Sequence, residues 1–295
     1  MKPKDARKMI EPFRVTNGRK FRLKEIDPEE CGPDGLEEKA AALLAEALSR
    51  MSDLQARLYA QNQWAVLLIF QAMDAAGKDS AIKNVMAGVD PQGVQVFSFK
   101  QPSHEELDHD FMWRCLKSLP ERGRIGIFNR SYYEETLVVR VHPEYLGPQH
   151  LPAKLVTRKI WEHRFEDIRA VERYLSRNGV MIRKFFLHVS KDEQRKRFLE
   201  RLDKPDKNWK FSAADLEERD RWDDYMKCYE DMIRETSSET APWFVVPADH
   251  KWFTRLVVAN AINDALDELE LEYPEANAAK RAELLKLRKG LARKR

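Results

Sequence analysis

The sequence contains few cysteines, and their spacing suits neither a disulfide framework nor a zinc site. Only three occur in 295 residues, Cys31, Cys115 and Cys228, with no CxxC pair and no paired histidines nearby. Disulfide-rich domains carry an even set of closely spaced cysteines, and structural zinc sites carry them in pairs. The sequence therefore argues against both classes and fits a reducing compartment.

Long hydrophobic runs are also missing. No apolar stretch approaches the roughly 20 residues that a helix needs to cross a bilayer. Residues 1–24 are basic and polar, without the apolar core of a signal peptide. Hydrophobic residues nevertheless make up 43% of the chain, which is enough for a sizeable core. We therefore expect a soluble, cytoplasmic protein with no membrane partner.

A strong net charge is absent, so only the distribution of charge is informative. The 52 basic and 49 acidic residues leave a net charge of +3. Residues 154–184 hold nine basic and four acidic side chains, and residues 280–295 are almost purely basic. Such runs suit a polyanion, whether nucleic acid, membrane phosphate or polyphosphate, but they also suit a solvated helix face. Charge alone leaves these alternatives open.

Short apolar runs separated by helical segments predict an α/β fold. The runs cover residues 64–70, 94–99, 125–128, 180–189 and 243–246. Strands that are continuously apolar are typical of a parallel sheet covered on both faces. Residues 36–62 have helical apolar spacing, whereas the stretch up to about Gly35 is interpreted as an extended arm. The pattern predicts one α/β/α domain with helical additions at both ends.

Residues 71–80 join the first apolar run to a helix and have the composition of a phosphate-binding loop. The small residues Ala75, Ala76 and Gly77 allow backbone N–H groups to point inward at an anion. Lys78 follows them, where a lysine reaches the terminal phosphates. An ordinary strand-to-helix turn is the alternative interpretation.

This loop departs from the usual pattern at two positions. Ala72 stands where the first glycine is expected, and Asp79 replaces the Ser or Thr that normally holds Mg²⁺. Asp74 is the substitute that we expect, because hard carboxylate oxygens suit Mg²⁺. A turn aspartate bonded to its own backbone is the alternative for Asp74.

Polar residues directly follow the apolar run at residues 125–128. Such residues lie at the carboxyl ends of strands, where α/β sheets bind ligands. Asn129 occupies a place where an acidic, metal-handling residue is expected, and Arg130 is placed to clamp phosphoryl oxygens. We expect Glu134 to face the acceptor pocket, where it would bind a second metal ion or accept a hydrogen bond from a nucleotide. The alternative is a glutamate at the start of a helix, stabilised by the helix dipole.

Residues 194–225 form a long, polar, helical segment. Arg197 and Arg201 are four residues apart and therefore share one helix face. Nucleotide kinases place a basic lid at this point, which closes over phosphates and excludes water. An ion-paired surface helix is the alternative.

Two further segments, residues 109–114 and 247–252, complete a set of five that runs in order from about Trp64 to Leu269. The other three are residues 71–79, 128–134 and 197–212. Together the five resemble the polyphosphate kinase 2 family, and the resemblance covers most of the chain.

The resemblance implies a three-layer α/β/α P-loop kinase fold, similar to thymidylate kinase, with a parallel central sheet and a helical lid. It divides the chain into an N-terminal arm and helix (residues 1–62), a kinase domain (63–270, lid about 194–222) and a basic tail (271–295). It implies reversible transfer of the terminal phosphoryl group of inorganic polyphosphate to AMP or ADP, forming ADP and ATP. Mg²⁺, or Mn²⁺ in its place, would assist, and a homodimer or homotetramer is expected.

The resemblance also implies roles for single residues. Asp74 would bind the metal, Lys78 the transferring phosphoryl group and Arg130 the phosphates. Glu134 completes the predicted catalytic set, and its combination with Asn129 looks like the subgroup that accepts both AMP and ADP. The lid would contribute Arg197, Arg201 and Lys210. The remaining predicted nucleotide or phosphate contacts are Ala75, Ala76, Gly77, Asp79, Ser80, Arg114 and Asn129.

Two other functions compete with this prediction. A conventional ATP-dependent nucleotide or small-molecule kinase would have a similar loop and lid, but the loop lacks the usual first glycine and the Ser or Thr. A nucleic-acid-binding module would use the basic helices and tail, but would leave Asp74 and Lys78 without a role. We therefore do not expect nucleic acid as a partner.

Overall fold

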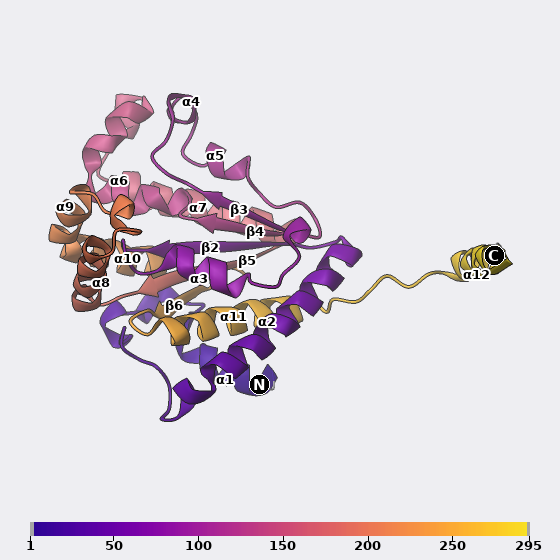
Figure 1. The fold of residues 1–295 in the computed structure, drawn as a ribbon. Coiled ribbons are helices and arrows are strands. Elements are labelled where there is room, and N and C mark those ends of the chain that lie inside the picture. The colour runs from indigo at the N-terminus through magenta and orange to yellow at the C-terminus, as the bar shows by residue number, and fades with distance from the viewer. Residues whose placement is uncertain (1–2, 294–295) are drawn as a thin grey trace.

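A single six-stranded sheet forms the centre of the computed structural model, which describes residues 3–293 (Figure 1). Its strand order is β1-β6-β5-β2-β4-β3. The strands are β1 (Arg14–Val15), β2 (Ala65–Ala72), β3 (Val94–Ser98), β4 (Ile125–Asn129), β5 (Val180–His188) and β6 (Trp243–Pro247). All five predicted runs are strands, and they pair in parallel.

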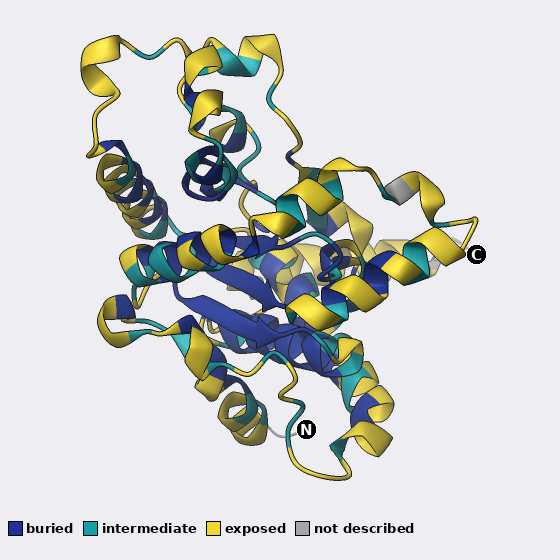
Figure 2. Cartoon of the chain, turned by 90° about the vertical axis from the view of Figure 1, so that its left-hand side faces the viewer, coloured by how far each residue is buried: buried dark blue, intermediate teal, exposed yellow. Residues whose placement is uncertain are grey.

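Helices cover the sheet on both faces (Figures 1 and 2). The described helices of the body are α1 (Pro3–Ile10), α2 (Leu36–Gln61), α3 (Lys78–Val85), α4 (His104–Leu107), α5 (Trp113–Leu116), α6 (Val138–Val141), α7 (Ile160–Arg177), α8 (Lys191–Asp203), α9 (Ala214–Asp220), α10 (Trp222–Thr236) and α11 (Lys251–Asp267). Helix α11 packs against α1, α2 and α3, and α7 packs against α10. No helix within residues 3–293 is long and apolar enough to cross a membrane.

The prediction of an extended N-terminal arm was wrong. The arm contains helix α1 and strand β1, which adds to the edge of the sheet in antiparallel pairing with β6. Ile10 and Phe13 are buried, and the ring of Phe13 contacts Phe253 edge-on. A strand of two residues is too short to produce a periodic signal, so the sequence pattern could not predict it.

The C-terminal segment ends in helix α12 (Ala278–Arg293), which stands apart from the body (Figure 1). The sequence pattern predicted a helical addition at this end, and the helix is present. Residues 272–277, which join it to the body, contain no helix or strand.

Strand β5 carries two buried cations that show how the layers are joined. Successive side chains on a strand point to opposite faces. Arg183 bonds Glu268 beyond α11, whereas Lys184 bonds Glu172 of α7 at 2.7 Å and the carbonyl of Thr236 of α10 at 2.7 Å. Each cation thus fixes the sheet to a different helix layer.

Glu172 also links this core to the segment that follows β4. Its Oε1 accepts from the hydroxyl groups of Tyr132 at 3.0 Å and Tyr133 at 2.7 Å, and all three side chains are buried. Lys184 donates to the Tyr133 hydroxyl as well, at 3.0 Å. Burial raises the pKa of both phenols well above their usual value, so they remain donors.

We expect Glu172→Gln to destabilise the fold by about 3–5 kcal/mol, because it leaves the Lys184 ammonium buried without its counterion. The shift in the midpoint of urea denaturation measures the effect. Glu166→Gln, at an exposed position of the same helix, is the control and should change stability by no more than about 0.5 kcal/mol. Equal midpoints for the two variants would contradict a structural role for this ion pair.

Candidate active site

The loop between β2 and α3 has the backbone of an anion-binding concavity. Ala75 and Gly77 have positive φ values of 61° and 103°, and such turns direct backbone N–H groups toward one point. Helix α3 begins directly afterwards at Lys78, so its positive dipole end faces the same side. The strand and helix predicted around this loop are both present.

Lys78 is buried at the base of the loop, where its side chain is 9% exposed. Its Nζ donates to the carbonyl oxygen of Ala72 at 3.3 Å. Burial lowers the pKa of Lys78, and the nearby Arg130 guanidinium lowers it further, whereas Asp74 and Glu134 oppose the shift. A phosphate placed in the loop would favour the charged ammonium in the same way as these carboxylates.

Arg130 lies between the two carboxylates. Its Nη2 donates to Asp74 Oδ1 at 3.2 Å, and its Nη1 lies 3.9 Å from Glu134 Oε2. The Glu134 carboxylate is the main cause of the raised pKa of Arg130. The backbone of Arg130 has a positive φ of 64°, and its backbone N–H donates to the backbone carbonyl of Phe70 on β2. The structure therefore brings together all four predicted catalytic residues.

Glu134 is held from a second side by Gln71, the residue before the last one of β2. The side-chain amide of Gln71 is oriented so that its nitrogen faces an acceptor and its oxygen faces a donor. Its nitrogen then donates to Glu134 Oε1 at 2.8 Å, and its oxygen accepts from Ser131 Oγ at 3.1 Å. Burial raises the pKa of Glu134, and Arg130 and Lys78 oppose the shift. The sequence reasoning assigned no function to Gln71, because a glutamine near the end of an apolar strand gives no distinctive signal.

Two residues that were predicted to contact phosphate bond each other. Asn129 Nδ2 donates to Asp79 Oδ1 at 2.8 Å, which ties the end of β4 to the first turn of α3. Ser80 Oγ accepts from Arg255 of α11 at 3.2 Å and therefore lies on the side of α3 that contacts α11. In this arrangement Asn129 and Asp79 brace the loop, and the hydroxyl of Ser80 is not grouped with Lys78 and Arg130.

Arg197 of helix α8 supports the loop from outside. It is 5% exposed, and all five of its N–H donors have partners. Nη1 donates to the carbonyls of Ala75 and Ala76, Nη2 donates to two carbonyls after β6, and Nε donates to Glu193. We predicted that Arg197 takes part in a closing lid, but here its guanidinium has no donor left for a phosphate.

Gln194 joins α8 to the same loop, and the sequence reasoning missed its role. Its Nε2 donates to the carbonyl of Asp74 at 2.9 Å, and its Oε1 accepts from Arg219 of α9 at 2.9 Å. Gln194 and Arg197 are three residues apart and so share a helix face. That spacing was visible in the sequence, but it does not say which face meets the loop.

The other predicted lid and pocket cations lie outside this cluster of contacts. The guanidinium of Arg201 is 5.7 Å from the ring centre of Phe198, and the side chain of Lys210 lies outside the described part of the structure. Arg114 donates to the carbonyl of Lys100 at 2.7 Å and lies over the ring of Phe99. The positive charge of Arg114 reaches Glu134, because it lowers the pKa of that carboxyl slightly against the effect of burial.

Asp74 is the best-placed ligand for a divalent cation. Its carboxylate is 32% exposed at the mouth of the loop, and Oδ1 already accepts from Arg130. Within residues 3–293 no three His, Cys, Asp or Glu side chains gather into a metal cluster. The donor set therefore fits Mg²⁺ bound by one carboxylate together with phosphates and water, and does not fit an all-protein cage.

A protein-family model and several known proteins match this chain along most of its length. A family model described as Polyphosphate kinase 2 matches residues 36–274. The chain is 54% identical to the ADP-polyphosphate phosphotransferase of Rhodopseudomonas palustris, over 95% of this chain and 97% of that protein. It is 44% identical to the AMP/ADP-polyphosphate phosphotransferase of Meiothermus ruber, over 92% of this chain and 97% of that protein.

A solved structure is similar along nearly the whole chain. The crystal structure of polyphosphate kinase 2 from Arthrobacter aurescens TC1 aligns with a TM-score of 0.85 at 42% identity, covering 94% of this chain and 96% of that chain. The predicted P-loop kinase fold is thus confirmed, with the antiparallel strand β1 as an addition to the otherwise parallel sheet.

We expect Arg197→Lys to weaken binding of magnesium tripolyphosphate by about 10- to 100-fold, since each lost hydrogen bond to a charged group is worth about 1.5–3 kcal/mol. A lysine keeps the charge but cannot bridge the carbonyls of Ala75 and Ala76 to those after β6. Calorimetric titration measures the affinity, and Arg195→Lys at an exposed position of α8 is the control. Equal affinities would show that the loop keeps its shape without this support.

Proposed function

This chain belongs to the polyphosphate kinase 2 family, and we propose that it transfers the terminal phosphoryl group of inorganic polyphosphate to AMP and ADP. It is a phosphotransferase, and the names of its relatives support this choice of donor and acceptors. Those names differ on AMP, so acceptance of both nucleotides is the finer part of the proposal.

One observation carries the assignment of the site. Lys78 lies at the base of an anion-binding loop and Arg130 beside it, and the carboxylates of Asp74 and Glu134 contact Arg130 and act electrostatically on Lys78. Phosphoryl transfer needs in-line positioning and positive charge around the equatorial oxygens of the transferred group. The two cations supply that charge, and the backbone N–H groups of the loop would hold the donor phosphates.

The acceptor needs little activation. The phosphate of AMP or ADP is already ionised, so its oxygen can attack the terminal phosphorus of polyphosphate without a strong general base. A new P–O bond forms to the nucleotide as the bond to the shortened polyphosphate breaks, and the released chain carries away the bonding electron pair. Lys78 and Arg130 are placed to offset the charge on the oxygens during this exchange.

A divalent cation completes this proposal. Mg²⁺, or Mn²⁺ in its place, would lie against Asp74 and supply neutralisation and alignment of the phosphate oxygens. Asp74 would then exchange part of its contact with Arg130 for the metal, which frees the guanidinium to bind phosphate.

A direct assay tests the function. Purified protein is mixed with AMP, polyphosphate and Mg²⁺ in the absence of ATP, and the products are separated by chromatography. Formation of ADP and then ATP supports the proposal. Product formation only when ATP replaces polyphosphate as donor would show instead a conventional ATP-dependent kinase.

We expect Lys78→Ala and Asp74→Ala each to lower turnover by about 10²–10³-fold, the typical cost of removing one key electrostatic contact. The polyphosphate-driven rate of ATP formation measures the loss, and circular dichroism checks that the fold remains. Lys83→Ala, at an exposed position of the same helix α3, should retain full activity. If either variant kept more than about a tenth of the activity, this loop would not be the active site.

We expect Glu134→Asn to lower kcat/KM for AMP much more than for ADP. AMP must sit one phosphate deeper than ADP to reach the donor in line, and a partly buried carboxylate beside Arg130 changes how that deeper phosphate is oriented. The ratio of the two kcat/KM values is the measurement. Glu135→Gln, a neighbouring carboxylate that bonds Gln149 instead, is the control. An unchanged ratio would leave Glu134 a purely structural residue.

A further inference from the structure

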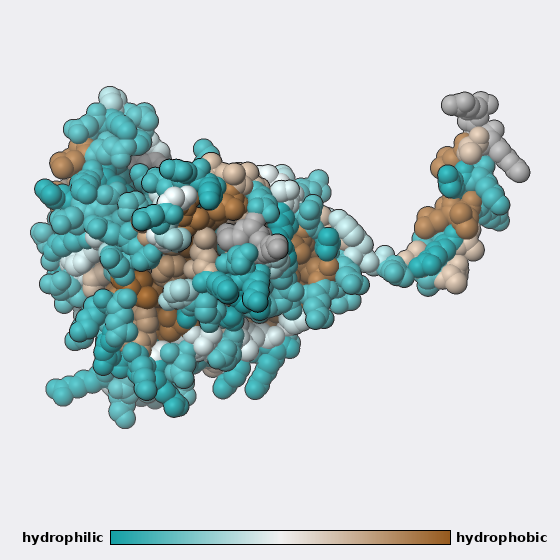
Figure 3. Space-filling view, turned by 90° about the horizontal axis from the view of Figure 1, so that it is seen from below, coloured by the Kyte–Doolittle hydropathy of each residue, from teal (hydrophilic) through white to brown (hydrophobic). Residues whose placement is uncertain are grey.

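Gln71 is a polar residue inside the central sheet. Polar side chains of this protein lie mainly at the surface, and Figure 3 shows hydrophilic residues over much of one face of the molecule. Gln71 instead is 1% exposed and belongs to β2, whose other residues are all apolar and buried. Burying an amide is costly unless both of its ends have hydrogen-bond partners. The partners of Gln71 therefore indicate what this side chain does.

Both ends of the Gln71 amide bond the segment that follows β4. Its oxygen accepts from Ser131 Oγ at 3.1 Å and from the backbone N–H of Ser131 at 3.2 Å, and its nitrogen donates to Glu134 Oε1 at 2.8 Å. Ser131 is fully buried, and its Oγ also accepts from the backbone N–H of Tyr133 at 3.2 Å. One end of the amide is thus fixed to the backbone, which directs the other end at the carboxylate.

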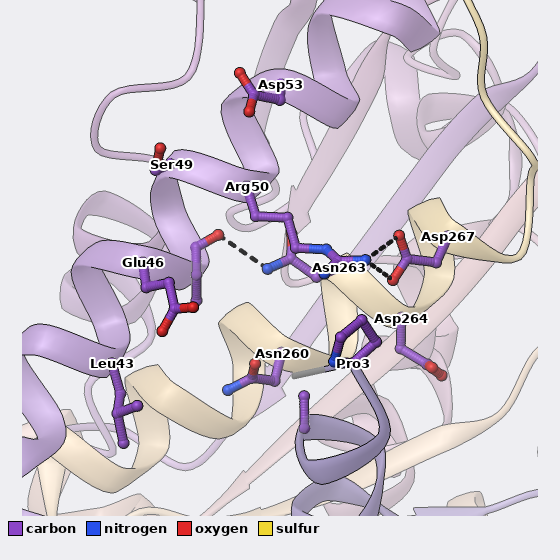
Figure 4. Close-up of a pocket in the computed structure, with 12 residues that line it drawn as sticks. Pro3, Leu43, Glu46, Ser49, Arg50, Asp53, Asn260, Asn263, Asp264 and Asp267 are labelled. Atoms are coloured by element: carbon purple, nitrogen blue, oxygen red, sulfur yellow. Dashed lines mark hydrogen bonds and ion pairs between the residues drawn. The ribbon is translucent and has the colours of Figure 1, made fainter. Parts of the chain in front are cut away.

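Glu134 is oriented by a neutral group instead of a cation. In the groove between α1, α2 and α11, by contrast, Arg50 donates to both oxygens of Asp267 at 2.8 Å (Figure 4). Arg130 Nη1 lies 3.9 Å from Glu134 Oε2, which is an ion pair without a hydrogen bond. The amide nitrogen of Gln71 is much closer to Glu134, at 2.8 Å. The bond to Gln71 therefore sets how the Glu134 carboxylate is turned.

This orientation leaves Arg130 available for phosphate. If Glu134 lost the donor of Gln71, a small rotation would close its distance to Arg130 and form a direct ion pair. Arg130 already donates to Asp74 at 3.2 Å, so a second carboxylate at hydrogen-bond distance would occupy its other terminal nitrogen. AMP has one phosphate to be held in line, whereas ADP has two and keeps further contacts. Loss of the Gln71 bond should therefore impair AMP more than ADP.

The ionisation of Glu134 depends on the same bond. Burial raises the pKa of Glu134, and a hydrogen bond donated to the carboxylate acts in the opposite direction. The charged groups that act on Glu134 from the surrounding elements are Asp74, Lys78, Arg114, Arg130 and Glu135. Tyr225, Tyr229 and Cys115 also lie near it, but burial raises their pKa values, so they stay neutral near neutral pH. The titration of Glu134 is therefore a direct measure of what Gln71 contributes.

We propose that Gln71 is a positioning residue, which fixes the Glu134 carboxylate beside Arg130 and thereby makes AMP an efficient acceptor. The inference rests on the proposed function, because it concerns how one of the two acceptors is held. Gln71 itself is buried and acts only through Glu134.

Two substitutions of Gln71 test this role in the full-length chain. Gln71→Met keeps the size of the side chain but removes the N–H donor, so kcat/KM for AMP should fall by about 10-fold relative to that for ADP. Gln71→Glu keeps a donor only while the introduced carboxyl and Glu134 share a proton, because two adjacent carboxylates do not readily ionise together. Compared with the unmodified chain at the same pH, its AMP-to-ADP ratio should be retained at low pH. The ratio should fall as the pH rises through about 8–9, where buried glutamates titrate.

A carbon-13 NMR titration of protein with labelled glutamate carboxyls gives the second measurement. The Glu134 signal is identified by its absence from Glu134→Asn. We expect Gln71→Met to raise the pKa of Glu134, with a change of about 10-fold in its ionisation constant, because the charged form loses a hydrogen bond. Gln149→Met is the matched control, since Gln149 donates to the neighbouring carboxylate of Glu135 at 2.9 Å. It should change neither the titration of Glu134 nor the AMP-to-ADP ratio.

Two outcomes would overturn the inference. An unchanged pKa of Glu134 in Gln71→Met would show that another group holds the carboxylate. A raised pKa of Glu134 with equal losses for AMP and ADP would show that Gln71 has no influence on the choice of acceptor. The titration needs no turnover, so these results are distinct from a failure of the proposed function, which would appear as absence of product from polyphosphate in the unmodified chain.

Discussion

Two cations and two carboxylates lie beyond the C-terminal ends of β2 and β4 and hold one another in place, and the rest of the site depends on these charge interactions. Asp74 and Glu134 contact Arg130 from two sides, and both favour the charged form of the buried Lys78. The charges of these four side chains nearly cancel. A phosphate chain therefore adds negative charge that the protein alone does not offset, which gives a physical reason for the divalent cation in the proposed function.

The loop that presents this cluster is kept in shape by its surroundings. Ala75 and Arg130 are both non-glycine residues with positive φ, a conformation that costs of order 1–3 kcal/mol for each residue. Arg197 holds the carbonyls of Ala75 and Ala76, and the N–H of Arg130 bonds Phe70 on β2. These contacts offset the strain, and they explain how the loop forms although Ala72 replaces the usual first glycine.

The sequence predicted most of the fold but only part of the site. Continuous apolar runs identified the five parallel strands, because burial on both faces leaves a clear pattern. The phosphate-binding loop and the role of Arg130 could be predicted because both directly follow apolar strands. The bond between Asn129 and Asp79 joins residues 50 positions apart, and no local pattern encodes such a contact. For Arg197, helical spacing predicted a shared face with Arg201 but could not show that this face meets backbone carbonyls instead of a substrate.

The anchored arginine also limits how the predicted lid can move. The first two turns of α8 are fixed to the loop by Gln194 and Arg197, so these turns cannot swing without breaking their bonds to the carbonyls of residues 74–76. Closure over a phosphate chain must therefore begin beyond Arg197. The end of α8 is tied instead to the segment after it, where Lys204 and Lys207 both bond Glu200 at an exposed site. Such surface ion pairs are worth little and are screened by salt. The ring of Phe211 also contacts the buried ring of Phe198 edge-on, and Asn208 can donate to the carbonyls of residues 201, 202 and 204. A rearrangement of residues 204–213 must break these contacts, while the loop beneath keeps its geometry.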